Sequence, residues 1–130
     1  MTRDELQAAG LAKPCVVVLS LPPRCLLPNS KVHWGTKKRA RKRSRCAAYC
    51  YALAVRPPKP WAKARETSRF YFRDRRWWPD PDGCLGWLKS AFDGIADAGV
   101  VGNDKNLSHR EVERYVDREN PRVEITIEEA

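Results

Sequence analysis

The stretch that most constrains the fold is residues 73–104, RDRRWWPDPDGCLGWLKSAFDGIADAGVVGND. From Leu85, apolar residues recur three, seven and ten positions later, which places them on one side of a helix. Gly99 then supplies a typical helix end. An amphipathic helix of this kind needs an apolar surface to pack on, so the rest of the chain should provide one.

Strand patterns on both sides of this helix predict that the surface is a sheet. Residues 15–21 (CVVVLSL) form a β-branched run next to prolines, which is typical of a buried strand. Residues 67–73 (TSRFYFR) place Phe70 and Phe72 on one face and basic residues or tyrosine on the other. Residues 122–128 (RVEITIE) alternate strictly and predict a half-buried strand.

Two further segments complete the expected order of elements. Residues 36–55 predict a second helix with a basic start and an alanine-rich end, and the proline-rich residues 56–64 end it. Residues 111–117 resemble the first strand of a terminal hairpin with residues 122–128. The order β-α-β-α-β-β predicts a small single α/β (α+β) domain, with a mixed sheet of about four strands and two main helices.

Length and charge fit one domain that meets a polyanion. The 130 residues predict a single domain over residues 14–130, preceded by a tail over residues 1–13. The net charge of +9 is uneven: residues 1–79 carry 19 Lys and Arg against 4 Asp and Glu, and residues 80–130 carry 6 against 12. The basic part suits a polyanion, and acids close to that polyanion need a cation.

The sequence also bears on cellular location and on the state of the cysteines. The first 13 residues have no apolar core of a signal peptide, and no run approaches the length of a membrane span. We expect a soluble cytoplasmic protein of a bacterium or a phage-infected cell, without membrane contact. Five scattered cysteines without a CxxC pair favour reduced, packed thiols over a zinc site.

The sequence Pro79-Asp80-Pro81-Asp82-Gly83 is the first candidate site. Pro81 favours extended backbone at Asp80, and residues two apart on extended backbone share a face. Two carboxylates on one face suit Mg²⁺, which takes one or two carboxylates together with phosphate and water oxygens. The same letters also form a good turn and helix start, and that reading stays open.

Lys89 and Asp104 extend this candidate site. On an ideal helix Lys89 lies near the azimuth of Asp82, so its ammonium group could reach a phosphate held at the helix start. The alternative is an ion pair with Asp93 one turn later. Asp104 supplies a third acid after the helix. His109, a lone histidine in a predicted loop, is expected to have no part in the site.

Two basic segments are candidates for binding a phosphate backbone. The first, residues 37–45, has seven basic residues in nine and no acid, a density that favours phosphate binding over a merely solvated face. The second precedes the acidic pair. Together they supply Lys37, Lys38, Arg39, Arg41, Lys42, Arg43, Arg45, Arg73, Arg75 and Arg76. Trp77 and Trp78 suit either stacking on a base or packing in the protein.

In their order and spacing these residues resemble the RusA family of Holliday-junction resolvases, particularly its phage members. In that family a D-x-D-N sequence begins a helix, a lysine lies on the helix, and an acid pair follows a short turn. Asp80 and Asp82 match the D-x-D, Lys89 matches the lysine, and Asp104 matches the second acid of the pair.

The resemblance covers most of residues 14–128 and includes two departures. Residues 21–34 (LPPRCLLPNSKVHW) are similar to the segment after the family's first strand, with Asn29 as its asparagine, which is expected to bind nucleic acid. Gly83 stands where asparagine is usual, and Asn103 stands where the first acid of the pair is usual.

This resemblance implies a metal-dependent endonuclease that resolves Holliday junctions or related branched DNA in recombination and repair. It implies catalytic roles for Asp80, Asp82, Lys89 and Asp104, with Mg²⁺ (or Mn²⁺ as a substitute) held by the three aspartates. A four-way junction has two symmetric cleavage points, so a homodimer is expected. The alternative is a basic nucleic-acid-binding protein without catalysis, and a structural protein of a ribonucleoprotein is a third reading.

Overall fold

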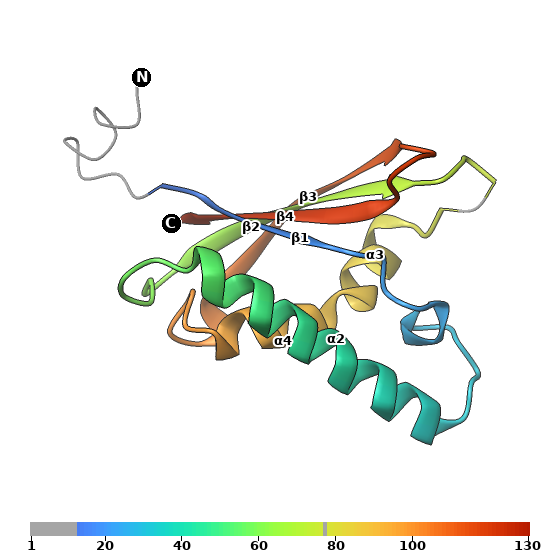
Figure 1. Cartoon of the computed structure of the whole chain (residues 1–130), viewed down its shortest axis with the longest axis horizontal. Coiled ribbons are helices and arrows are strands. Elements are labelled where there is room, and N and C mark those ends of the chain that lie inside the picture. Colours follow the sequence, from blue (N-terminus) through green and yellow to red (C-terminus); the bar gives the residue numbers. More distant parts are fainter. Residues whose placement is uncertain (1–12, 77) are drawn as a thin grey trace.

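The computed structural model describes residues 13–76 and 78–130, in which the helices lie on one face of a four-stranded sheet (Figure 1). Residues 1–12 of the expected tail, and Trp77, lie outside the described residues. The elements are β1 (Cys15–Leu19), the 3₁₀ helix η1 (Arg24–Leu26), α2 (Trp34–Val55), β2 (Ala64–Phe72), α3 (Pro81–Trp87), α4 (Lys89–Asp97), the 3₁₀ helix η2 (Asp104–Asn106), β3 (Leu107–Val116) and β4 (Arg122–Glu129). The expected mixed four-stranded α+β domain is confirmed.

The strand order is β1-β4-β2-β3. β2 and β3 run parallel, since the chain returns between them through α3 and α4, and β4 is antiparallel to both β1 and β2. The expected hairpin between the last two strands is therefore wrong. Strict alternation shows which face of a strand is buried but not which strands lie beside it, and β4 lies between β1 and β2 instead of next to β3.

The inward-facing side chains of the sheet form the core with the helices. Burial alternates along all of β2, and Phe70 and Phe72 point inward as predicted. The Phe70 ring stacks on Trp87 of α3, with 6.0 Å between ring centroids. α2 meets the core through the fully buried Ala48 and Ala52. Among the described residues, no helix has the length and apolar character required to cross a membrane.

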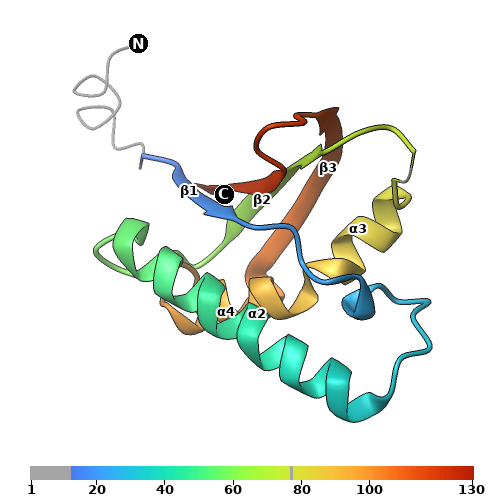
Figure 2. The ribbon, with the colours of Figure 1, turned by 45° about the vertical axis from the view of Figure 1, so that its right-hand side comes forward.

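The helix predicted from Leu85 to Gly99 is broken in two at Leu88. This residue is fully buried, has φ −94° and ψ 3°, and its amide donates to the carbonyl oxygens of both Cys84 and Leu85. The apolar spacing continues across the break, so periodicity could not reveal it. α3 and α4 consequently point in different directions, with α3 next to the η1 segment and α4 beside α2 (Figure 2).

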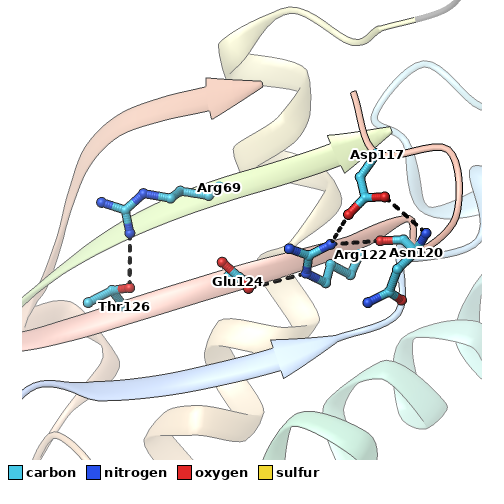
Figure 3. Close-up of polar contacts among 6 residues, drawn as sticks. All are labelled: Arg69, Asp117, Asn120, Arg122, Glu124 and Thr126. Carbon is cyan, nitrogen blue, oxygen red and sulfur yellow. Dashed lines mark hydrogen bonds and ion pairs between the residues drawn. The ribbon is translucent and has the colours of Figure 1, made fainter. Parts of the chain in front are cut away.

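On the face of the sheet turned away from the helices, charged and polar side chains of β2, β4 and the β3–β4 loop contact one another (Figure 3). Arg122 on β4 donates to the carboxylates of Asp117 at 2.7 Å and Glu124 at 3.2 Å. The hydrogen bond from Arg122 lowers the pKa of the Asp117 carboxyl. On the neighbouring strand, Arg69 donates to the hydroxyl of Thr126 at 3.2 Å. These contacts tie β2, β4 and the β3–β4 loop together on this face.

Candidate functional site

Asp80 is positioned by the start of α3. Pro81 occupies the first turn, where its missing N–H costs nothing, and Asp80 is the N-cap with extended backbone. The Asp80 Oδ1 accepts a hydrogen bond from the Gly83 amide at 2.7 Å. A Cβ atom at position 83 would lie 2.7 Å from the same oxygen, so a side chain there would require a small shift of the flexible Asp80 carboxylate.

Asp80 and Asp82 line an open cavity of about 600 Å³ together with Asn29, from a segment about fifty positions earlier. Two contacts place that segment against α3. The Trp87 indole donates to the Pro23 carbonyl at 2.9 Å, and the missing side chain of Gly86 leaves room for Pro28, whose Cγ would lie 2.7 Å from a Cβ there. The cavity thus gathers oxygen-bearing side chains from both parts of the chain.

Arginines line two neighbouring hollows that share Leu21 and Pro22 with each other. Arg39 and Arg43 of α2 line the hollow on one side of the η1 segment. Arg73 and Arg76 line the hollow next to the end of β2. Residues of the segment 21–29 therefore line the cavity that contains Asp80 and Asp82 and also line both arginine-bearing hollows.

The basic residues predicted to bind phosphate are exposed, except Lys37, which is half-buried and donates to the Ser30 carbonyl. Arg45 has a different role, because its guanidinium makes two hydrogen bonds to the Asp97 carboxylate, at 2.6 and 2.9 Å. This pairing joins α2 to α4 and lowers the pKa of Asp97. Arg45 is thus a poor member of the phosphate-binding set, and the sequence had no local signal of its distant partner.

Lys89 is paired within its own helix. Its ammonium group lies 2.8 Å from the Asp93 carboxylate, and 70% of its side chain is exposed. This is the ion pair that the sequence left open as the alternative to a phosphate contact. Exposed pairs of this kind are weak, so Lys89 remains free to exchange its partner when an anion is present.

Asp104 lies at the other end of β3 from Asp80. It begins η2 directly before β3, whereas Arg114, seven residues along that strand from Leu107, donates to the Pro79 carbonyl at 2.9 Å. Seven residues of strand span about 23 Å. Within residues 13–76 and 78–130, no three His, Cys, Asp or Glu side chains lie close enough to hold a metal ion. A single chain therefore brings Asp80 and Asp82 together but not Asp104.

Two side chains near the acidic pair have structural roles. Trp78 stacks on Phe72 with 5.5 Å between centroids and donates to the Asp74 carbonyl at 2.8 Å, which favours packing over base stacking. Burial raises the pKa of the Cys84 thiol to about 11, so it is neutral at physiological pH and offers no thiolate.

Sequence reasoning missed a polar cluster on the inner face of the sheet. Glu66 on β2 is fully buried, and its carboxylate contacts Ser68 and His109. The signal was present, because alternation from Phe70 and Phe72 puts Glu66 on the same inward face. A buried carboxylate among apolar side chains requires polar partners.

Substitution can separate the capping role of the Asp80 side chain from the role of its negative charge. Asp80→Asn keeps a good N-cap and should change the free energy of unfolding by no more than a few tenths of a kcal/mol. Asp80→Ala removes the cap and should cost about 1 kcal/mol. Chemical denaturation of the three proteins measures this difference. Equal stability of all three would show that the cap does not hold α3.

No protein-family model matches the chain. An uncharacterized protein of Xylella fastidiosa (strain Temecula1 / ATCC 700964) is 31% identical over 124 residues, a match covering 92% of this chain and 79% of that protein. The chain therefore belongs to the same family as this uncharacterized Xylella protein.

Proposed function

We propose that the protein is a Mg²⁺-dependent endodeoxyribonuclease of the Holliday-junction resolvase type, which cuts branched DNA. The observation that carries the proposal is the cavity lined by Asp80, Asp82 and Asn29, because the segment 21–29 that supplies Asn29 also lines two hollows that carry arginines. Carboxylates can bind a divalent cation, and a nearby basic surface can bind the phosphate that the cation also contacts.

The donor set of the cavity fits Mg²⁺, which prefers oxygen ligands. Asp82 and the oxygen of Asp80 that does not cap α3 would hold the ion, and Asn29 adds a neutral polar group at the wall. A divalent ion bound there supplies charge for the phosphate and lowers the pKa of a coordinated water. The side chains orient the phosphate, and the exposed arginines neutralise the backbone beyond the cut.

A homodimer accounts for the position of Asp104. A twofold interface pairs position i of one copy with position j of the other, and j with i. A surface with Asp80 and Asp82 near one end and Asp104 near the other can therefore form two equal composite sites. We propose that each site takes Asp80 and Asp82 from one chain and Asp104 from the second copy. Two sites in a dimer match the two cuts that a four-way junction requires.

A non-catalytic nucleic-acid-binding protein is the second candidate, and the Asp80 cap favours it. In that case DPDG serves as a helix start, and the exposed basic residues of α2 provide the affinity. The two functions differ in whether a phosphodiester bond is broken.

Labelled synthetic four-way junction and linear duplex, each with Mg²⁺ or EDTA, test the proposal. The protein should nick the junction symmetrically in Mg²⁺ only, and Asp82→Asn should lower the rate at least about 10²-fold while binding is kept. Glu119→Gln, which neutralises an exposed acid in the β3–β4 loop, is the control and should cut normally. Tight binding without cutting by the unmodified protein would favour the second candidate.

A further inference from the structure

Glu66 is a buried carboxylate with both oxygens engaged. Its side chain has no exposed surface, its Oε2 accepts a hydrogen bond from the Ser68 hydroxyl at 2.5 Å, and its Oε1 lies 2.7 Å from the His109 Nδ1. Removing a carboxylate from water is costly unless hydrogen bonds replace the solvent. Ser68 and His109 are thus the groups that make this charge acceptable inside the sheet.

The contact with Glu66 determines how His109 presents its ring. An ionised carboxylate only accepts hydrogen bonds, so the Nδ1 of neutral His109 carries the proton and the Nε2 keeps its lone pair. The imidazole also packs on Phe92, with 4.6 Å between ring centroids, which holds its plane. Its side chain is 39% exposed, so solvent and substrate have access to it.

His109 and Asp104 lie in the same part of the fold. Both come at the amino-terminal end of β3, five positions apart, and both are next to α4, since η2 packs on this helix and the His109 ring packs on Phe92. In the proposed dimer this end meets the acidic cavity of the second copy. An oriented imidazole is then available beside the phosphate.

We propose that His109 is the general base of the nuclease and that Glu66 is its positioning residue, a role that rests on the proposed function. The Nε2 takes a proton from water while the water oxygen forms the new bond to phosphorus. The bond from phosphorus to the leaving nucleotide oxygen breaks, and that oxygen takes up a proton from solvent. The Glu66 carboxylate balances the imidazolium charge until the proton is released.

Several charged groups lie on the elements that surround His109. The Glu66 carboxylate is the one in contact with the ring. The others are Lys89, Asp93 and Asp97 on α4, Arg45 on α2, and Asp104 and Lys105 on η2. Most of these are already paired with each other, so Glu66 is the group whose removal should change the ring most.

The arrangement has an internal comparison, because the chain has only two histidines. His33, the N-cap of α2, accepts a hydrogen bond on its Nδ1 from the Gly35 amide at 3.1 Å. The neutral forms of the two rings should therefore be opposite tautomers. ¹⁵N NMR of histidine-labelled protein above pH 8 should show a protonated Nδ1 at His109 and a protonated Nε2 at His33. A neutral His109 with its proton on Nε2 would overturn the proposal, whatever the tautomer of His33.

Cleavage rates as a function of pH test the catalytic role. His109→Asn keeps a donor for Glu66 but removes the Nε2, so it should slow junction cleavage at least about 10²-fold and abolish the fall in rate at acidic pH. Glu66→Gln should have a smaller effect in the same direction. The matched control is His33→Asn, which keeps its capping role. Normal cleavage by His109→Asn with an unchanged pH profile would overturn the base assignment and leave the nuclease intact. Lack of cleavage by the unmodified protein would overturn both.

Discussion

An equimolar mixture of Asp82→Asn and Asp104→Asn protein is expected to cut four-way junctions, although neither variant cuts alone. In the composite sites proposed here, a mixed dimer has one site with both substitutions and one site with neither. The intact site takes Asp82 from the Asp104→Asn chain and Asp104 from the Asp82→Asn chain. The physical basis is the separation of the two acids along β3 within one chain.

The size of the recovery distinguishes the possible arrangements. Random exchange of subunits makes about half of the dimers mixed, each with one working site of two, so nicking should return to about a quarter of the unmodified rate. The measurement is nicking of one labelled strand after co-refolding or prolonged mixing of the variants. A site built within a single chain gives no recovery, and that result would eliminate the composite site.

Gly94→Ala is expected to lower the free energy of unfolding by about 2–3 kcal/mol or more. A Cβ atom at this position would lie 2.2 Å from the carbonyl oxygen of Arg45 and 3.1 Å from the Cβ of Ala48. Both neighbours belong to α2, and the first is backbone, so the two helices must separate to admit one methyl group. This loss outweighs the roughly 1 kcal/mol of stability that alanine usually gains over glycine within a helix. Loss of this amount removes a large part of the stability of a small domain.

Gly102→Ala is the matched control. A Cβ atom there would lie 3.8 Å from the Trp61 carbonyl oxygen, an ordinary contact, so stability should change little. Urea denaturation followed by circular dichroism compares the two variants with the unmodified protein. A Gly94→Ala protein as stable as the control would show that α2 and α4 are not in close backbone contact.

The parts of the fold predictable from sequence are those governed by local periodicity. The alternation in β2 gives its buried face, and the apolar spacing after Leu85 gives the helical region. Neighbouring strands are a property of the whole sheet, so the position of β4 between β1 and β2 was missed. The break at Leu88 was missed because it leaves the apolar spacing unchanged.

In the candidate site, too, neighbours in sequence could be predicted and contacts between distant residues could not. Asp80 and Asp82 are close in sequence and line a common cavity, but not as predicted: only Asp80 has extended backbone, and Asp82 lies in the first turn of α3. Asp104 returns after a helix and a turn, and spacing alone cannot say at which end of the molecule it arrives. The prediction that His109 lies in a loop is wrong, since it is on β3, and it looked solitary because the carboxylate that holds it comes from β2, more than forty positions earlier.

The central place of β4 has a consequence for folding during synthesis. β1 leaves the ribosome early, but its Val17 pairs with Ile125, and β2 also pairs with β4. Nothing joins β1 to the other strands until the last strand has emerged. Contacts between distant parts of a chain form slowly, so a nascent chain holds an unpaired, β-branched β1 for most of its translation. A chaperone that binds extended apolar segments would find β1 accessible during this period.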